Sequence, residues 1–337
     1  MGITLVTGGA GFIGTHLVAT LLDQNAEVRV LDLHEPRISH ASLSWEKGSI
    51  TDAAAVASAM EGVTRVYHLA AVAGLWARDK RQLVEVNRQG THEIMKAAAS
   101  RNVERVVHCS TEAVLKSRHR FRATGATIDE DVSLDLDDMV GPYCQGKFLA
   151  EQEVLQAARN GLPVVIVNPT VPIGPGDHNL TPPARMLLGF LNGKHPGYLD
   201  TELNLVDARD VAMGHILAAE HGRVGERYTL GGTNLHLGEL LAQLEGLTGL
   251  TMPRRKVPYP LALIVAAVSE FTADYITGRP PAVPLTGVRL AGSTMRFDNL
   301  KARNELGATF RPLQETLTEA VADFQRRGLL HAELALS

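Results

Sequence analysis

The chain has 337 residues, of which 45 % are hydrophobic, and a net charge of −4, so it is long enough for two lobes with sizeable cores. It has no basic stripe, and nucleic acid is therefore not an expected partner. Its two cysteines, Cys109 and Cys144, suit a reducing compartment, and we expect a cytoplasmic protein.

Strands and helices alternate through the first half of the sequence. In chain order, the predicted strands are 3–7, 27–32, 65–69, 104–109 and 163–168, and the predicted helices are 12–24, 52–60, 80–100 and 142–160. Strands that alternate with helices form a parallel sheet covered on both faces, and right-handed crossovers make that sheet doubly wound. Because the chain runs directly into its first strand, we expect no leader segment.

A glycine-rich turn, TGGAGFIG, joins the first strand to the first helix. Gly8 can adopt the positive φ of a tight turn. Gly11 has no Cβ, which lets backbone N–H groups approach a pyrophosphate, and Gly14 lets the helix pack close to the strand. The second strand ends at Asp32, where a carboxylate can bind the hydroxyls of an adenosine ribose. The pattern predicts a site for NAD rather than NADP, since Asp32 would repel the extra phosphate.

The regular alternation stops after Asn168, where several prolines and glycines interrupt the chain. A strand and a helix at 204–219 then return to the first domain. The expected domains are a dinucleotide-binding domain of residues 1–168 with 204–231, and a smaller mixed α/β substrate-binding lobe of residues 169–203 with 232–330.

The second lobe is expected to contain helices near 236–248, 260–272 and 312–327. Its longest apolar run, Leu261 to Val268, is shorter than the roughly 20 residues of a membrane-spanning helix, so no transmembrane segment is expected. This run can pack within the lobe, or it can form an apolar wall for a terpenoid or steroid, with contact to a membrane surface as a further alternative.

Four side chains near strand ends and on one helix suggest acid–base chemistry. Tyr143 and Lys147 are four residues apart and share one face of their helix. Ser110 and Thr111 follow a predicted strand, at the edge of the sheet where ligands bind. The Lys147 cation is expected to lower the pKa of Tyr143 from its ordinary value of about 10. Tyr143 could then move a proton while a nicotinamide moves a hydride.

These motifs together resemble an extended short-chain dehydrogenase/reductase with a Rossmann fold, of the NAD-dependent epimerase/dehydratase superfamily. Within it, the chain is most similar to the branch of 3β-hydroxysteroid dehydrogenases, dihydroflavonol reductases and the hopanoid-associated sugar epimerase. The resemblance covers nearly the whole chain and rests on TGGAGFIG at 7–14, Asp32, HLAA at 68–71, VN at 86–87, ST at 110–111, YCQGK at 143–147, NPTVPIGP at 168–175, LNLVDARDVA at 203–212 and MRFDNLKARNELG at 295–307.

The resemblance implies a catalytic triad of Thr111, Tyr143 and Lys147. It implies that Lys147 also holds the nicotinamide ribose. The implied cofactor-binding residues are Gly8, Gly11, Phe12, Ile13, Gly14, Asp32, Ser49, Ile50, Leu69, Ala70, Ala71, Asn87, Tyr143, Lys147, Pro169 and Val171. The candidate substrate-side residues are Trp76, Glu112, His178 and Tyr198. The histidines and cysteines lack metal-ligand spacing, and no metal is expected.

Three positions depart from the pattern of the family. Ser49 stands where many members have an acid that reads the adenine. Leu203 stands where nucleotide-sugar enzymes have an arginine that clamps the diphosphate. Thr111 is followed by Glu112 and Ala113, whereas sugar dehydratases carry two acids there, and elimination needs both an acid and a base.

The leading hypothesis is an NAD-dependent oxidoreductase that acts on a secondary alcohol or ketone of a terpenoid-, steroid- or flavonoid-like substrate. One alternative is a sugar or nucleotide-sugar 4-epimerase with tightly bound NAD, and another is a non-catalytic NAD-binding module. A homodimer through the helices at 80–100 and 142–160 is expected, because Ile94, Phe148 and Leu155 would otherwise be exposed. The sequence leaves open the substrate, its stereochemistry and the direction of the reaction.

Overall fold

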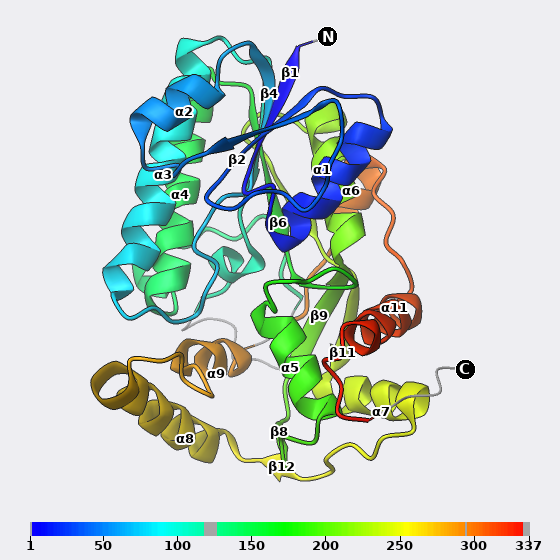
Figure 1. Ribbon diagram of the computed structural model, residues 1–337. Coiled ribbons are helices and arrows are strands. Elements are labelled where there is room, and N and C mark those ends of the chain that lie inside the picture. Colours follow the sequence, from blue (N-terminus) through cyan, green and yellow to red (C-terminus); the bar gives the residue numbers. More distant parts are fainter. Residues whose placement is uncertain (1, 118–126, 294, 333–337) are drawn as a thin grey trace.

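A seven-stranded parallel sheet forms the centre of the molecule in this computed structural model, which describes residues 2–117, 127–293 and 295–332 (Figure 1). The strand order is β10-β6-β5-β4-β1-β2-β3, and every neighbouring pair is parallel. In chain order the strands are β1 (Ile3–Thr7), β2 (Val28–Asp32), β3 (Leu43–Lys47), β4 (Val63–His68), β5 (Arg105–Cys109), β6 (Val164–Pro169) and β10 (Arg227–Leu230).

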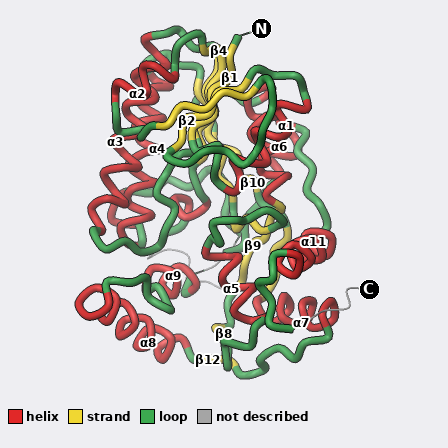
Figure 2. Tube along the Cα trace, viewed as in Figure 1, coloured by secondary structure: helices red, strands yellow, loops and turns green. Residues whose placement is uncertain are grey.

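Helices cover both faces of this sheet (Figure 2). One face carries α2 (Ala53–Ala59), α3 (Lys80–Ser100) and α4 (Gly141–Arg159), and the other carries α1 (Phe12–Asp23) and α6 (Ala208–His221). Aliphatic side chains of the strands fill both layers of core, because a strand covered on both faces buries successive side chains. The expected doubly wound α/β sheet is confirmed. Its strand order reverses between β1 and β4, which places a ligand crevice at their carboxyl ends.

A second lobe is built around two small sheets. The larger has the order β11-β9-β7 and is mixed, with β9 parallel to β7 and antiparallel to β11. Its strands are β7 (Val171–Ile173), β9 (Glu202–Asp207) and β11 (Thr233–His236), and the smaller sheet pairs β8 (Tyr198–Leu199) with β12 (Lys256–Val257). Around them lie α5 (Pro182–Leu191), α7 (Leu237–Thr248), α8 (Tyr259–Thr272), α9 (Leu285–Ala291) and α11 (Leu313–Arg326). In contrast, α10 (Leu300–Leu306) packs against α6 and β10 of the main sheet.

Several elements differ from the sequence-based expectation. The strand expected to return to the main sheet is β9, and it pairs in the small sheet, whereas α6 and β10 do join the main fold. β3 was not predicted because it is a half-exposed edge strand without clear alternation. α5 begins with two prolines, which we read as a break, although proline is favoured in a first helical turn.

The helix expected at 260–272 is longer than its apolar core suggests. α8 continues through a π-helical turn, η3 (Ala273–Thr277). Among the described residues, Tyr259–Thr277 is one helix of 19 residues whose length and composition alone would suffice to cross a membrane. The run Leu261 to Val268 is thus shorter than the apolar helix that contains it, and a single helix of this kind does not by itself indicate a transmembrane segment.

Candidate active site

The turn between β1 and α1 forms one wall of the candidate site. Gly8 has a φ of +74°, and a Cβ at this position would lie 2.7 Å from the backbone nitrogen of Ala70. A Cβ on Gly14 would lie 2.1 Å from the carbonyl oxygen of Gly8. Gly11 is the N-cap of α1, and no side chain caps the first N–H groups of the helix. Such a helix end suits a phosphate group, which needs donors and a positive dipole.

Asp32 fixes the shape of this turn from the end of β2. Its Oδ2 accepts a hydrogen bond from the Ala10 nitrogen at 3.1 Å, and its Oδ1 accepts one from the His34 nitrogen at 3.0 Å. Each carboxylate oxygen can accept a second hydrogen bond. The half-buried carboxylate can therefore hold the turn and also receive the hydroxyls of a ribose.

A chain of buried side chains holds the loop after β4 against the glycine turn. Thr7 Oγ1 accepts a hydrogen bond from the Ala70 nitrogen at 3.2 Å and lies 2.7 Å from His68 Nδ1. His68 Nε2 lies 3.0 Å from Thr91 Oγ1. Burial, with the nearby Lys147 cation, lowers the pKa of His68 to about 3, so its ring is neutral. The loop is thus fixed by neutral hydrogen bonds.

Asn87 was expected to touch the cofactor, and the structure gives its side chain another partner. Its Oδ1 accepts from the Val72 nitrogen at 2.7 Å, and its Nδ2 donates to the Val72 oxygen at 3.3 Å. A buried amide needs such partners. Asn87 therefore holds the loop that carries Leu69, Ala70 and Ala71, which are themselves half-buried.

Four other residues that were expected to bind the cofactor lie near the carboxyl edge of the main sheet. Ser49 Oγ lies 2.8 Å from Thr51 Oγ1, so the hydroxyl is engaged within its own loop. Ile50 is buried against α3. Phe12 and Ile13 lie in the first turn of α1, where Phe12 is buried.

Thr111 lies two residues after the end of β5 and caps a short 3-10 turn, η1 (Glu112–Leu115). Its Oγ1 donates a hydrogen bond to the Glu112 carboxyl at 2.6 Å and accepts one from the Ala113 nitrogen at 3.3 Å. Burial raises the pKa of Glu112. The neighbouring Ser110 Oγ is buried and has no hydrogen-bond partner among the described residues.

Tyr143 lies in the first turn of α4, beside this pair of residues. Burial and the Glu112 carboxyl raise the pKa of Tyr143, and an interaction with the Thr111 side chain opposes them. The direction is the reverse of our expectation that Lys147 would lower this pKa. The reason is that loss of water disfavours a buried phenolate, and a neighbouring carboxylate disfavours it further. Tyr143 is therefore held as a phenol, which is a proton donor.

Lys147 lies one turn further along α4 and is 4 % exposed. Its Nζ donates a hydrogen bond to the Cys109 oxygen at 2.7 Å. Burial lowers the pKa of Lys147. The ammonium is thus positioned at the end of β5, next to Ser110 and Thr111, by one backbone carbonyl.

Two buried side chains that the sequence reasoning did not single out support Thr111. Asn168 Nδ2 donates to the Thr111 oxygen and to Glu151 Oε2, each at 3.1 Å. Glu151 is fully buried and also accepts from Arg227 at 2.7 Å. No spacing along the chain indicates this network, because its members come from β6, α4 and β10. Asn168 lies within NPTVPIGP, beside Pro169, which is buried.

A pocket of about 550 Å³ lies between α8, α9 and the start of α4. It is lined by Met139, Val140, Gly141, Tyr259, Leu263, Ala267, Leu285, Arg289, Gly292 and Ser293. Most of these side chains are apolar, and Gly141 is two residues before Tyr143. The pocket therefore offers apolar surface close to the helix that carries the candidate proton donor.

The expected substrate-side residues are not all brought together. Trp76 Nε1 donates to Asp274 Oδ1 at 2.7 Å and so joins η3. Tyr198 packs at the edge of the second-lobe core, against Gly238. His178 is exposed, and the pKa of its ring is lowered by partial burial and by Arg327. Among the four expected residues, Glu112 is the one that directly contacts the triad.

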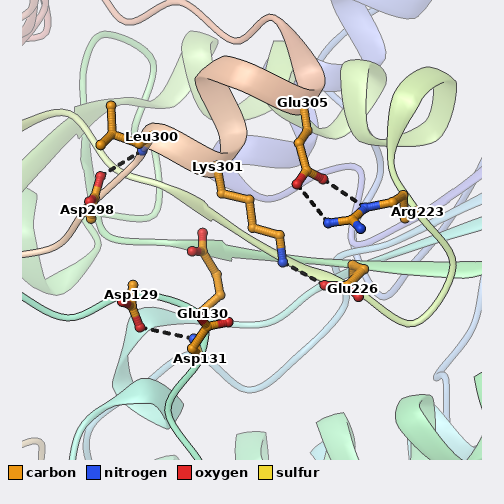
Figure 3. Close-up of a pocket in the computed structure, with 9 residues that line it drawn as sticks. All are labelled: Asp129, Glu130, Asp131, Arg223, Glu226, Asp298, Leu300, Lys301 and Glu305. Atoms are coloured by element: carbon orange, nitrogen blue, oxygen red, sulfur yellow. Dashed lines mark hydrogen bonds and ion pairs between the residues drawn. The ribbon is translucent and has the colours of Figure 1, made fainter.

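A second pocket, of about 470 Å³, is lined mainly by charged side chains (Figure 3). Two ion pairs cross it, Arg223 with Glu305 and Lys301 with Glu226. Arg223 and Glu226 precede β10, so this pocket lies away from the carboxyl edge of the sheet. Six of its lining side chains are acidic and two are basic. Because it lies away from the carboxyl edge of the sheet, we assign it no part in the site.

The homodimer was expected because three apolar side chains on two helices would otherwise be exposed, and the structure shows that they are covered within one chain. Ile94 is fully buried and Phe148 is 8 % exposed, while Leu155 is half-buried. α3 and α4 pack closely against each other and against the sheet, and this packing covers the apolar side chains that we expected to point outward.

Comparisons with known proteins agree with this geometry. The model of the NAD-dependent epimerase/dehydratase family matches residues 4–231. A protein of Synechocystis sp. with the provisional name dihydroflavonol 4-reductase is 37 % identical over 97 % of this chain and 96 % of its own length. Sterol demethylase protein B of Methylococcus capsulatus is 31 % identical over 97 % of this chain and 99 % of its own length.

Solved structures share the whole fold. The crystal structure of gox2253 is 34 % identical and superposes with a TM-score of 0.83, covering 98 % of this chain and 100 % of that chain. A dTDP-glucose 4,6-dehydratase of Streptomyces venezuelae, solved with NAD, is 27 % identical with a TM-score of 0.77, covering 97 % of this chain and 98 % of that chain.

Proposed function

This chain belongs to the NAD-dependent epimerase/dehydratase family, and from that premise we propose that it oxidises or reduces an apolar secondary alcohol or ketone. The proposal rests chiefly on one observation, the Tyr143 phenol beside the Thr111 hydroxyl at the carboxyl edge of the sheet, where burial raises the pKa of Tyr143. Such a pair can move a proton to or from a substrate oxygen, which is what a carbonyl–alcohol conversion requires.

The glycine turn fits a dinucleotide, because a Cβ at Gly8 or Gly14 would meet backbone atoms within 3 Å and so close the turn. We assign the pyrophosphate to Gly8, Gly11 and the start of α1, and the adenosine ribose to Asp32. Lys147 would hold the nicotinamide ribose. When bound, NAD would accept or supply the hydride. The flanking residues assigned to the same site are Phe12, Ile13, Ser49, Ile50, Leu69, Ala70, Ala71, Pro169 and Val171, with Asn87 in a supporting role.

The proton is assigned to Tyr143. In reduction, its phenol would donate to the substrate carbonyl oxygen. The Thr111 hydroxyl would orient that oxygen by turning its proton from Glu112 to the substrate. The Glu112 carboxyl accepts a hydrogen bond from Thr111, and burial raises the pKa of that carboxyl. Glu112 would therefore position the Thr111 hydroxyl before the substrate binds.

Leu203 and the pocket by α8 favour an apolar substrate. Leu203 is 7 % exposed and lies opposite Leu235 in the small sheet. A diphosphate left there without a cationic partner would cost several kcal/mol, on the order of the penalty for an unpaired buried charge. Apolar ring systems would gain about 25 cal/mol for each Å² that they bury. The substrate class we propose is therefore terpenoid-, steroid- or flavonoid-like.

A screen of ketosteroids, hopanoid ketones, flavonoid ketones and simple aldehydes, followed by the absorbance of NADH, tests this function. We expect turnover of at least one apolar ketone, and faster turnover with NADH than with NADPH. Calorimetric titration with UDP-glucose and UDP-galactose is the matched comparison. Binding of a UDP-sugar, with no turnover or binding of any apolar ketone, would overturn the proposal.

The similarity to a sugar-nucleotide dehydratase keeps a nucleotide-sugar 4-epimerase as a second candidate. An epimerase retains its cofactor, because the hydride must return to the same substrate. The absorbance of purified protein before any cofactor is added distinguishes the two: a stoichiometric nicotinamide signal, with epimerisation of UDP-galactose, would favour the epimerase. The third hypothesis, a non-catalytic NAD-binding module, requires that neither assay shows turnover.

Two further proposals concern the assembly of the protein and its location. A homodimer is now supported by the family resemblance alone, and light scattering at micromolar protein tests it. A cytoplasmic location is supported by Cys109 and Cys144, which are buried and free. Fractionation of cells that produce the tagged chain tests that location.

A further inference from the structure

A stripe of large apolar side chains lies uncovered along α8 and η3, at the lower edge of the molecule in Figure 1. Their exposed fractions run from 47 to 76 %. They recur every three or four residues, so they share one face of the helix. The members of this outer stripe are Leu261, Ile264, Val265, Val268, Phe271, Tyr275 and Ile276.

The opposite face of the same helix is fixed to the body of the protein. Lys80 Nζ forms ion pairs of 2.7 Å with both Glu270 and Asp274. Asp274 also accepts a hydrogen bond from Trp76 at 2.7 Å. The two acids of the helix thus face the protein, and the outer stripe carries no charge. A helix anchored in this way can lie along a bilayer, but it would have to break these contacts to cross one.

Basic side chains stand at both ends of the outer stripe. Arg254, Arg255 and Lys256 precede α8, while Arg279 follows η3 and Arg78 lies close to Gly278; all five basic residues are exposed. Two of them have acidic partners, Arg254 with Glu245 and Lys256 with Asp200. An apolar face with cations at its ends is the pattern of a helix that lies in the interface of an anionic membrane.

The same charges disfavour a second copy of the chain as the occupant of the stripe. Two such helices could pack parallel or antiparallel, and in either arrangement a basic end would meet a basic end. Like charges placed opposite one another work against such a contact. An anionic lipid surface meets both the apolar face and the cations favourably.

We propose that the outer stripe of α8 and η3 docks this protein on the surface of a bilayer that contains anionic lipid. The outer face would enter the boundary between head groups and acyl chains, and the inner face would continue to line the pocket beside α4. On the function proposed above, an apolar substrate could then pass from lipid to pocket around a single helix. The docking itself does not depend on that reaction.

Flotation of the full chain with phosphatidylcholine vesicles, with and without phosphatidylglycerol, tests the docking. We expect binding to the anionic vesicles, weakened at high salt because the Debye length falls from about 10 Å at 0.1 M to about 3 Å at 1 M. The double variant Ile264→Glu/Val268→Glu should bind at least tenfold more weakly, since it places two charges in the apolar boundary. Arg255→Glu/Arg279→Glu should lose the preference for phosphatidylglycerol.

The matched control is Val224→Glu, which adds a charge at an apolar position that is 50 % exposed but lies outside the outer stripe. It should bind vesicles like the parent, and all variants should melt cooperatively near the parent temperature. Absence of vesicle binding by the parent, or equal binding by the Ile264/Val268 variant, would overturn the proposal. So would light scattering in which that variant dissociates a dimer while its vesicle binding is unchanged. Turnover of substrate in free solution is a separate readout, and its failure would bear on the proposed reaction instead.

Discussion

At the scale of single residues, the site is a small set of groups whose protonation is set by burial. Tyr143, which is half-buried, and Glu112, which is buried, are acids with raised pKa values. Lys147, a buried base, has a lowered pKa. Each shift favours the uncharged form, because a low-dielectric site penalises charge. Within the triad, burial thus disfavours the charged forms of Tyr143 and Lys147.

Tyr143→Phe should remove the proton donor while leaving the ring packing intact. We expect turnover to fall by roughly 10²–10⁴-fold, the usual scale for a lost proton-transfer group, with little change in NAD affinity. Lys147→Ala should weaken both, because it removes the proposed ribose contact as well as a buried charge. Steady-state rates and NAD titration calorimetry measure the two effects, and an equal loss of NAD affinity in both variants would contradict this separation of roles.

Thr111 and Ser110 are adjacent buried hydroxyls, and one serves as the control for the other. Thr111→Ser should retain most activity, whereas Thr111→Ala should lose roughly 10²–10⁴-fold. Ser110→Ala should be nearly neutral for turnover, because Ser110 Oγ has no hydrogen-bond partner among the described residues. If Ser110→Ala is the damaging change, the wrong hydroxyl has been assigned to the substrate.

The raised pKa of Tyr143 predicts opposite pH profiles for the two directions of reaction. Reduction needs the phenol as an acid, and a raised pKa keeps that phenol protonated through neutral pH, so its rate should be flat there and fall only in strongly alkaline solution. Oxidation needs the phenolate as a base, so its rate should rise by about tenfold for each pH unit below the pKa. Initial rates in both directions over pH measure this. An oxidation rate that levels off near neutral pH would show that bound cofactor lowers the pKa substantially.

At the scale of elements, the turn from β1 to α1 requires glycine at positions 8 and 14, because a Cβ at either position would meet backbone atoms. Gly14 is packed against the Gly8 carbonyl, which is why α1 can begin close to the strand. Sequence spacing identified this turn because the steric demand is local, within eight residues. The start of α4 is also indicated by a local signal, because its first turn contains a proline.

Gly14→Ala should therefore be destabilising, by about 1–3 kcal/mol, because its Cβ would overpack the turn. Gly246→Ala, in α7, is a matched control with no atom within 4 Å of the added Cβ. It should stabilise the protein by about 0.5–1 kcal/mol, since alanine is the better helix former. Urea unfolding measures both, and NAD affinity should fall in the Gly14 variant alone. Equal stability of the two variants would contradict the packing described here.

At the scale of the whole molecule, Lys116 joins the two lobes. It follows η1 in the first lobe, is 1 % exposed, and its Nζ donates to the Leu290 oxygen in α9 at 2.9 Å. Burial lowers the pKa of Lys116 to about 8. Sequence reasoning passed over it because an isolated lysine carries no signal of burial.

Between about pH 8 and the ordinary lysine pKa of about 10.4, the unfolded chain binds a proton at Lys116 that the folded chain does not. The contribution of Lys116 to stability therefore rises with pH across that window, by up to about 3 kcal/mol. The free energy of unfolding of the parent, minus that of Lys116→Met, should increase accordingly in urea titrations. Lys96→Met, at an exposed position of α3, should show no such trend. A flat difference for Lys116→Met would refute the lowered pKa.

The sequence by itself determined what depends on short-range pattern. Strands β1, β2, β4, β5 and β6, helices α1 to α4 and the doubly wound class followed from alternation, caps and glycine spacing, because these act between residues that are close along the chain. The sequence also indicated Thr111, Tyr143 and Lys147 as the candidate catalytic residues, and their functional roles stay predictions.

Only the tertiary structure decided which distant groups meet. Thr7 and His68 are 61 residues apart, and Asn168 reaches Thr111 across 57 residues. Tertiary packing also buries Ile94 and places the Val72 backbone within hydrogen-bond distance of the Asn87 side chain. It raises the pKa of Tyr143 and leaves the outer stripe of α8 exposed. Burial and hydrogen-bond partners are properties of packing between distant segments, and the pattern of residues along the chain does not specify which segments pack together.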